Sequence, residues 1–174
     1  FPEEPKASQS VSGKTKAKRP DNPGPRTPTP RGRLGYFNLH GLVNTANWYG
    51  QRDPFADNPL ASTEVEYPVA LRPADIQPAR RAGQAGVPQV IFSEACFGTH
   101  ILGKTVDQAM SLKFLESGSL GVVGSTVTSY GSIGAPLIAA DWLGQSFWRN
   151  VQAGLPVGEA LHQAKASLAQ ELDR

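Results

Sequence analysis

Short apolar runs and amphipathic stretches alternate along the chain from residue 34 onward. The run 34–39 (LGYFNL) is predicted to form a buried strand that ends at His40 and Gly41. The run 87–95 (VPQVIFSEA) is predicted as a second strand, apolar enough to be covered on both faces, and 120–125 (LGVVGS) as a third. Three such runs predict a small sheet buried between other layers.

Apolar side chains recur at helical spacing in three later segments. The first covers 105–117 and is stopped by Gly118, and the second runs from about 135 to 153 with Pro136 near its first turn. A last amphipathic helix is predicted to begin near Pro156 and to run close to the C-terminus. This order of strands and helices is typical of an α/β domain with a mostly parallel sheet, although three strands make that sheet thin.

Two segments lack such periodicity. The stretch 1–29 is rich in Pro, Ser, Lys and Gly, so we expect 1–32 to be a flexible basic linker or tail and 33–174 to be the domain. The stretch 42–85 mixes aromatic residues with Asp, Asn, Pro and Gly, and is predicted as a long functional loop region that contains short elements.

Composition narrows the class of protein. The 174 residues suit one domain, and the 39% hydrophobic and 18% charged contents are those of a globular protein. The net charge of +2 comes from basic residues gathered before residue 34, so the remainder is acidic on balance and no nucleic-acid surface is expected.

No run approaches the roughly 20 apolar residues that span a bilayer, and no signal-peptide pattern opens the chain. Because the sequence starts at Phe1 without a methionine, we expect the native N-terminus to lie elsewhere, and the compartment stays open.

The single cysteine, Cys96, excludes an intrachain disulfide and a multi-cysteine zinc site. It is either a buried structural thiol or a reactive one. Because Glu94 lies two residues before it, at the end of an otherwise apolar strand, we expect this strand end to open onto a polar cleft.

His40 and Cys96 both follow predicted strands of the same sheet. Sites of open α/β sheets lie at the carboxyl ends of their strands, so the two side chains are expected to share a cleft. An imidazole can activate a thiol as a nucleophile, and the backbone N–H groups of Gly41 and Cys96 are candidates for an oxyanion hole. The alternative for His40 is a structural histidine.

The other two histidines are weaker candidates. His100 lies four residues after Cys96 and is a rival base if that stretch is helical. His162 sits between polar neighbours on the last helix, and we expect it to be a solvated surface residue.

The segments 34–41 (LGYFNLHG) and 90–98 (VIFSEACFG) resemble the His-Gly and Cys motifs of the caspase-like peptidase clan. The segment 104–171, with VVGSTVTSYGS and GLPVGEALHQAKASLAQE, is similar to the C-terminal half of gingipain-type peptidase domains. The resemblance covers roughly 33–172. It implies a caspase-like three-layer α/β fold, a Cys/His dyad of Cys96 and His40 with Gly41 at the oxyanion, and cysteine endopeptidase activity directed by the P1 side chain.

The resemblance also implies a substrate pocket. Glu94 occupies the position, two before the cysteine, that lines the P1 pocket in several branches of the clan. A carboxylate there favours Lys or Arg as the P1 residue. The loop after the third strand, with Ser125, Thr126 and Tyr130, resembles the other pocket wall, and Asp141 is a further acidic candidate. The alternative for Glu94 is a structural carboxylate paired with an arginine.

The chain departs from the family because no strand signal precedes residue 34. We therefore expect the missing strands to come from a second chain or an upstream fragment, with 14–19 as a basic site for self-processing. The partner expected otherwise is a protein or peptide substrate, and no cofactor, metal, nucleic acid or membrane is expected. Three alternatives stay open: a catalytically silent caspase-like binding module within a larger assembly, a transpeptidase or amidase that keeps the dyad, and nucleic-acid binding through the basic tail.

Overall fold

The computed structural model describes residues 33–51, 67–78, 86–132 and 134–172. The expected tail at 1–32 and the processing site at 14–19 lie outside these ranges. The central element is a parallel sheet of three strands in the order β1 (Leu34–Phe37), β5 (Val90–Ser93) and β6 (Gly121–Gly124). The three predicted strands are therefore confirmed, each somewhat shorter than its apolar run.

Strand β5 lies between β1 and β6, and both of its faces are covered. Ile91 packs on one side in a cluster with Met110 and Phe114, and Phe92 packs on the other side with Phe147. Successive side chains of a strand point to opposite faces, which is how a continuous apolar run fills two cores.

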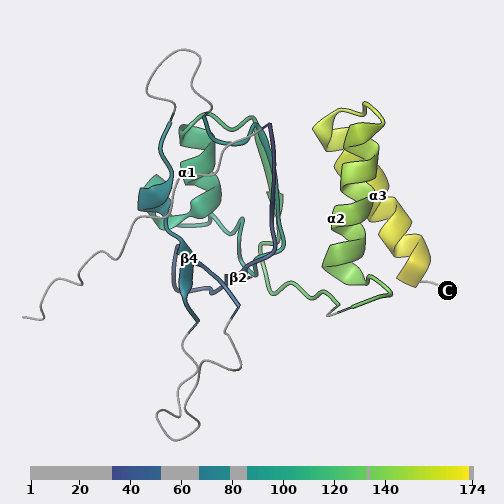
Figure 1. Cartoon of the computed structure of the whole chain (residues 1–174), viewed down its shortest axis with the longest axis horizontal. Coiled ribbons are helices and arrows are strands. Elements are labelled where there is room, and N and C mark those ends of the chain that lie inside the picture. The colour runs from purple at the N-terminus through teal and green to yellow at the C-terminus, as the bar shows by residue number, and fades with distance from the viewer. Residues whose placement is uncertain (1–32, 52–66, 79–85, 133, 173–174) are drawn as a thin grey trace, which may run out of the picture.

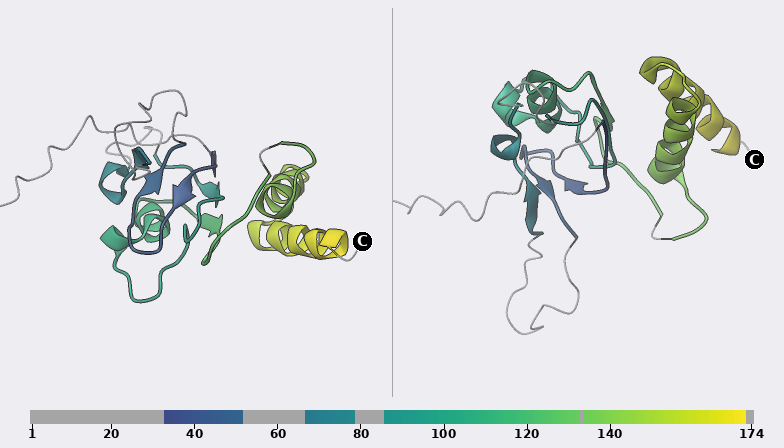
Figure 2. Two further views of the ribbon diagram at one scale, coloured as in Figure 1. Left: turned by 90° about the horizontal axis from the view of Figure 1, so that it is seen from below. Right: turned by 45° about the horizontal axis from the view of Figure 1, so that its top comes forward.

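Helices cover both faces of the sheet (Figure 1). Helix α1 (Met110–Glu116) lies on one side, and α2 (Ala139–Gln152) and α3 (Val157–Leu172) pack together on the other. The two views of Figure 2 show the same separation of α1 from the α2/α3 pair. The mixed α/β arrangement with a parallel sheet agrees with the prediction. Among the described residues, no helix combines the length and the apolar character needed to cross a membrane.

The region predicted as a long loop contributes a second sheet in its described parts. Strands β2 (His40–Gly41), β3 (Trp48–Tyr49) and β4 (Val69–Leu71) pair antiparallel in that order, and a 3₁₀ turn follows at Pro73–Asp75. Trp48 is 2% exposed and anchors this sheet against Phe37 and Phe114. His40 and Gly41 thus belong to the second sheet, just beyond the end of β1, and not to the parallel sheet itself.

Helix boundaries follow the sequence prediction with two adjustments. The predicted helix at 105–117 is divided into a 3₁₀ turn at Val106–Gln108 and α1. The predicted helix from about residue 135 begins only at Ala139. The Asp141 carboxylate accepts hydrogen bonds from the Ser132 backbone N–H and hydroxyl, which folds the preceding segment back over the first turn of α2. Pro136 therefore precedes the helix.

Candidate functional site

His40 and Cys96 follow neighbouring parallel strands at the same offset. In the β1/β5 register Phe37 is opposite Ser93, and each candidate residue lies three positions beyond its member of that pair. The Phe37 carbonyl also accepts a hydrogen bond from the Glu94 amide at 2.9 Å, which extends the pairing past the strand ends. The two motifs therefore lie together at the carboxyl ends of the strands, where open α/β sheets place their sites.

The backbone of Gly41 packs directly on the backbone of Cys96. A Cβ added at Gly41 would lie 1.9 Å from the Cys96 carbonyl oxygen and 3.3 Å from the Ala95 Cβ. No side chain larger than hydrogen fits at that separation, so a glycine after His40 is a steric requirement of this contact. The contact joins the His-Gly segment to the cysteine segment.

Cys96 lies in a tight turn that projects from the end of β5. The Gly98 N–H donates to the Ala95 carbonyl at 3.0 Å, and Phe97, between them, has a φ of +55°. A bulky residue in the left-handed region is uncommon and is held there by its surroundings, here by a hydrogen bond from Phe97 N to the Val127 carbonyl at 2.9 Å. Among the described residues, none accepts a hydrogen bond from the Cys96 amide. That N–H remains available next to the thiol, as an oxyanion hole needs.

The Cys96 sulfur contacts the backbone of Ser129. Sγ accepts a hydrogen bond from the Ser129 N–H at 3.2 Å and lies 3.4 Å from the Ser129 carbonyl oxygen, to which the thiol donates. Cys96 as a residue is of intermediate burial. The loop after β6 therefore lies against the candidate nucleophile.

His40 is held by two side chains of its own sheet region. Its Nε2 lies 2.8 Å from Gln51 Oε1, and its ring centroid lies 4.6 Å from that of Tyr67. With Gln51 Oε1 as acceptor, Nε2 carries the proton of the neutral imidazole and Nδ1 keeps the free lone pair that a base needs. His40 and Cys96 are not hydrogen-bonded to each other; Gly41 links them through the backbone contact.

The remaining histidines take no part in this arrangement. The turn that contains His100 is not helical, and its ring meets the Phe97 ring edge-on at a centroid distance of 6.3 Å. Its Nδ1 is buried, and no described group hydrogen-bonds to it. His162 is exposed on α3, in agreement with the sequence prediction.

Glu94 belongs to a cluster of polar side chains from three elements. Tyr36 of β1 donates its hydroxyl hydrogen to Glu94 Oε1 at 2.7 Å, and Asp141 of α2 lies near the same carboxyl. Helix α2 can approach because Gly144 lacks a side chain: a Cβ there would lie 3.3 Å from Glu94 Oε1. Among the described residues, no arginine pairs with Glu94, so the structural Arg–Glu pair is not what holds it.

The surroundings of Glu94 favour its protonated form. Burial is the largest cause that raises the pKa of Glu94; the Tyr36 hydrogen bond acts in the opposite direction, and the neighbouring Asp141 carboxyl raises it further. The result is a pKa of about 7. Burial and the neighbouring Glu94 also raise the pKa of Tyr36, so its hydroxyl remains a donor.

Tyr36 was not among the residues predicted from the sequence, whereas Glu94 and Asp141 were. The pattern did contain a signal for it. Tyr36 is opposite Phe92 in the β1/β5 register, and Glu94 follows Phe92 by two residues, so the alternation of strand side chains places all three on one face. The stacked rings of Tyr36 and Phe92, with centroids 6.4 Å apart, agree with that placement.

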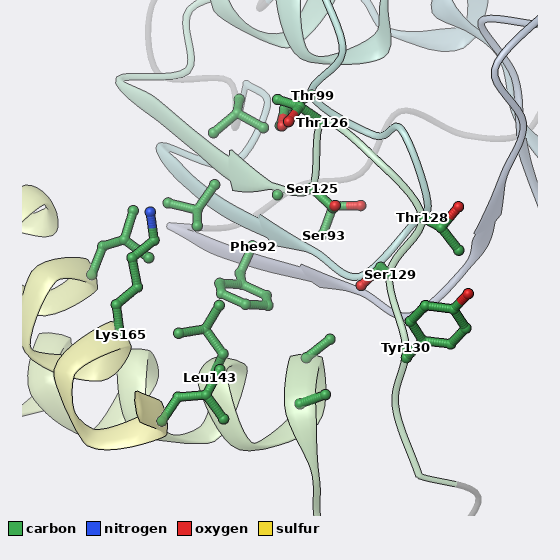
Figure 3. Close-up of a pocket in the computed structure, with 17 residues that line it drawn as sticks. Phe92, Ser93, Thr99, Ser125, Thr126, Thr128, Ser129, Tyr130, Leu143 and Lys165 are labelled. Atoms are coloured by element: carbon green, nitrogen blue, oxygen red, sulfur yellow. The ribbon is translucent and has the colours of Figure 1, made fainter. Parts of the chain in front are cut away.

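The residues predicted to line the substrate pocket fall into two hollows. Ser125, Thr126 and Tyr130 line a cavity of about 520 Å³ between the sheet and the α2/α3 pair. In Figure 3, Ser129 and Tyr130 lie on one side of Phe92, and Lys165 reaches in from α3 on the other. Asp141 lines a separate hollow together with Tyr36 and the aromatic ring of Trp148. The loop that carries Ser129 and Tyr130 leads from the first hollow past Cys96 to the second.

A metal ion needs a group of His, Cys, Asp or Glu side chains, whose arrangement is described over residues 33–51, 67–78, 86–132 and 134–172. No group of three or more His, Cys, Asp and Glu side chains in these ranges is arranged to hold a metal ion.

The close contact at Gly41 predicts a specific intolerance to substitution. Gly41→Ala forces the His-Gly segment away from Cys96, because the new Cβ overlaps the Cys96 carbonyl oxygen. We expect a lower melting temperature and slower alkylation of Cys96 in the folded protein. Gly50→Ala is the matched control in the same region, since a Cβ there meets its nearest neighbour at an ordinary 3.6 Å. Equal behaviour of the two variants would contradict the packing described here.

The raised pKa of Glu94 predicts a pH-dependent stability. The folded protein keeps a proton on Glu94 up to a pH of about 7, whereas the unfolded chain releases it near 4.5, so this group makes the free energy of unfolding fall as pH rises between those values. Melting temperatures of the wild type and Glu94→Gln are measured from pH 4.5 to 8. As pH rises, the melting temperature of the wild type is expected to fall relative to that of Glu94→Gln. Glu159→Gln on the exposed surface of α3 serves as the control. A constant difference between wild type and Glu94→Gln would rule out the titration.

Comparison of the chain with protein-family models, with curated proteins and with solved structures gives no match in any of the three.

Proposed function

We propose that the chain carries the catalytic centre of a caspase-like cysteine endopeptidase, with Cys96 as nucleophile and His40 as acid and base. The observation that carries the proposal is the contact of Gly41 with the Cys96 backbone, which brings the His-Gly and Cys segments together at the ends of adjacent parallel strands. The resemblance of both segments to the motifs of that clan adds to it.

The chemistry follows from the groups present. His40 removes the thiol proton, and the Cys96 sulfur attacks the carbonyl carbon of the scissile peptide bond. The unpartnered Cys96 N–H, with that of Gly41, stabilises the negative charge on the carbonyl oxygen. The amine leaves with the proton from His40, and water then hydrolyses the thioester. A hydrogen bond between His40 and Cys96 is not needed in the free protein, because such bonds often form only with substrate.

Recognition of a basic P1 residue is assigned to Glu94 with Asp141. Both carboxyls lie beside a hollow that also presents aromatic rings, and in the described chain neither is paired with a cation. A Lys or Arg side chain supplies the missing positive charge, while an Asp side chain is repelled.

The proposal also includes a second polypeptide that completes the sheet. Strand β1 is at the edge of the parallel sheet, and Leu34 and Tyr36 on it are 49% and 51% exposed. Long exposed edges with large apolar side chains are usually covered in folded proteins. We propose that an upstream fragment, released by self-processing at 14–19, or a separate chain pairs with β1.

The rival function is a catalytically silent binding module. It is favoured by one observation. The Cys96 thiol is hydrogen-bonded to Ser129 and the His40 imidazole to Gln51, so the thiol and the imidazole are not hydrogen-bonded to each other. Chemical reactivity separates this function from the peptidase.

Peptidase activity is tested with a positional-scanning peptide library. We expect cleavage after Lys or Arg, and loss of kcat/KM by about 10³-fold or more in Cys96→Ala and in His40→Ala. His162→Ala, on the exposed face of α3, is the control that keeps full activity. Rapid stoichiometric labelling of Cys96 by an Arg-directed acyloxymethyl ketone is the expected companion result.

Three outcomes would contradict parts of the proposal. Labelling only after unfolding would indicate the silent module. Cleavage after Asp alone would refute the role of Glu94 and leave the dyad intact. Products in which an added amine replaces water would make the enzyme a transpeptidase.

The second polypeptide is tested by intact mass and size-exclusion chromatography of the native protein. We expect a second mass that co-elutes with this chain, and loss of that partner in Leu34→Lys at the β1 edge. Leu120→Lys, on a side chain that is 78% exposed beside β6 at the opposite edge, is the control. An active protein that consists of one unprocessed chain would refute this part of the proposal.

A further inference from the structure

The cavity between the sheet and the α2/α3 pair is separate from the hollow assigned to the P1 side chain. Its volume of about 520 Å³ is in the range of cavities that hold small molecules. Strands β5 and β6 line it with Phe92, Val122 and Val123, and the two helices line it from the other side with Leu143 and Leu161. The middle of the cavity is therefore apolar on both sides.

Lys165 brings a positive charge to this apolar cavity. Among the described residues that line it, Lys165 is the only one with a charged side chain. In Figure 3 its side chain rises from α3 on one side of Phe92 and Leu143. No Asp or Glu in the described part of the chain forms an ion pair with it. A lysine can lay its apolar stem along such a wall and keep its ammonium in water, so the ammonium stays available to an anion.

The side of the cavity away from Lys165 is polar but carries no charge. It is lined by the loop after β6, where Thr126, Thr128 and Tyr130 contribute hydroxyl groups. These three residues are exposed, so their hydroxyls are hydrated in the free protein. The charge that a ligand meets in this cavity is thus the single positive charge of Lys165.

We propose that this cavity binds an amphipathic monocarboxylate, with its carboxylate at Lys165 and its alkyl chain between Phe92 and Leu143. One ammonium matches one carboxylate, and no acidic side chain in the described lining repels it. A cationic ligand would be repelled by Lys165, and a ligand with several phosphates would exceed the one charge present. The alkyl chain gains free energy from burial against the apolar walls. The inference does not depend on the proposed peptidase function, because neither His40 nor Cys96 lines the cavity.

Affinity is measured by calorimetric titration of the whole chain with octanoate, nonanoate and decanoate. Each added methylene is expected to strengthen binding by up to about fourfold, the effect of burying one more CH₂ group. Failure of decanoate to bind, or an affinity that does not change with chain length, would overturn the proposal.

Lys165→Gln tests the place of the carboxylate. We expect this variant to bind decanoate about fivefold more weakly than the wild type, as the loss of an exposed ion pair would do, and to bind the uncharged analogue decanol equally well. Arg149→Gln is the matched control, because Arg149 is exposed on α2, carries the same charge and does not line the cavity. Equal decanoate affinity in Lys165→Gln and the wild type would refute the assignment, and so would an equal loss in Arg149→Gln.

The position of the alkyl chain is tested by methyl NMR on protein labelled with ¹³C at Leu and Val methyl groups. Decanoate is expected to shift the signals of Val123, Leu143 and Leu161, which line the cavity. The signal of Leu71 is the internal control, because that side chain is buried in the core on the α1 side of the sheet. Unchanged signals from the three lining residues, or a shift of equal size at Leu71, would show that decanoate binds elsewhere and would overturn the proposal.

Discussion

The close approach of two backbone segments determines the geometry of the candidate site. Gly41 lies against the Cys96 carbonyl with room only for a hydrogen, and the contact forms because β1 and β5 are parallel neighbours whose ends are in register. The apolar runs decide that pairing, since burial of Ile91 and Phe92 on opposite faces fixes which residues of β5 point to each core. The placement of His40 beside the Cys96 segment therefore depends on how the hydrophobic pattern sets the strand register several residues away.

A single loop connects the nucleophile with the carboxyl cluster. The segment after β6 binds the Cys96 turn through Ser125, Val127 and Ser129, and it meets the first turn of α2 where Ser132 donates to Asp141. The Asp141 carboxyl and the Cys96 sulfur therefore contact the same loop. The proposed recognition of a cationic side chain and the proposed attack on its carbonyl rest on this continuity.

Much of this arrangement could be predicted from the sequence, because continuous apolar runs indicate buried strands and helical spacing of apolar residues indicates the longer helices. The runs around Ile91 and Val122 fixed the sheet, and the offset of His40 and Cys96 from their strands pointed to one edge of it. The antiparallel sheet of β2, β3 and β4 was beyond prediction, since strands of two or three residues carry no periodicity. The hydrogen bonds of Cys96 to Ser129 and of His40 to Gln51 depend on how the loops fold in space. The spacing of residues along the sequence does not predict such contacts.

The shared site of His40 and Cys96 is the claim on which the rest depends. The most direct measurement is the rate of alkylation of Cys96 by iodoacetamide in the folded protein, compared between the wild type, His40→Ala and His100→Ala. The account predicts that only the loss of His40 slows the reaction, because that imidazole takes up the thiol proton. A slower rate in His100→Ala with no change in His40→Ala would contradict it.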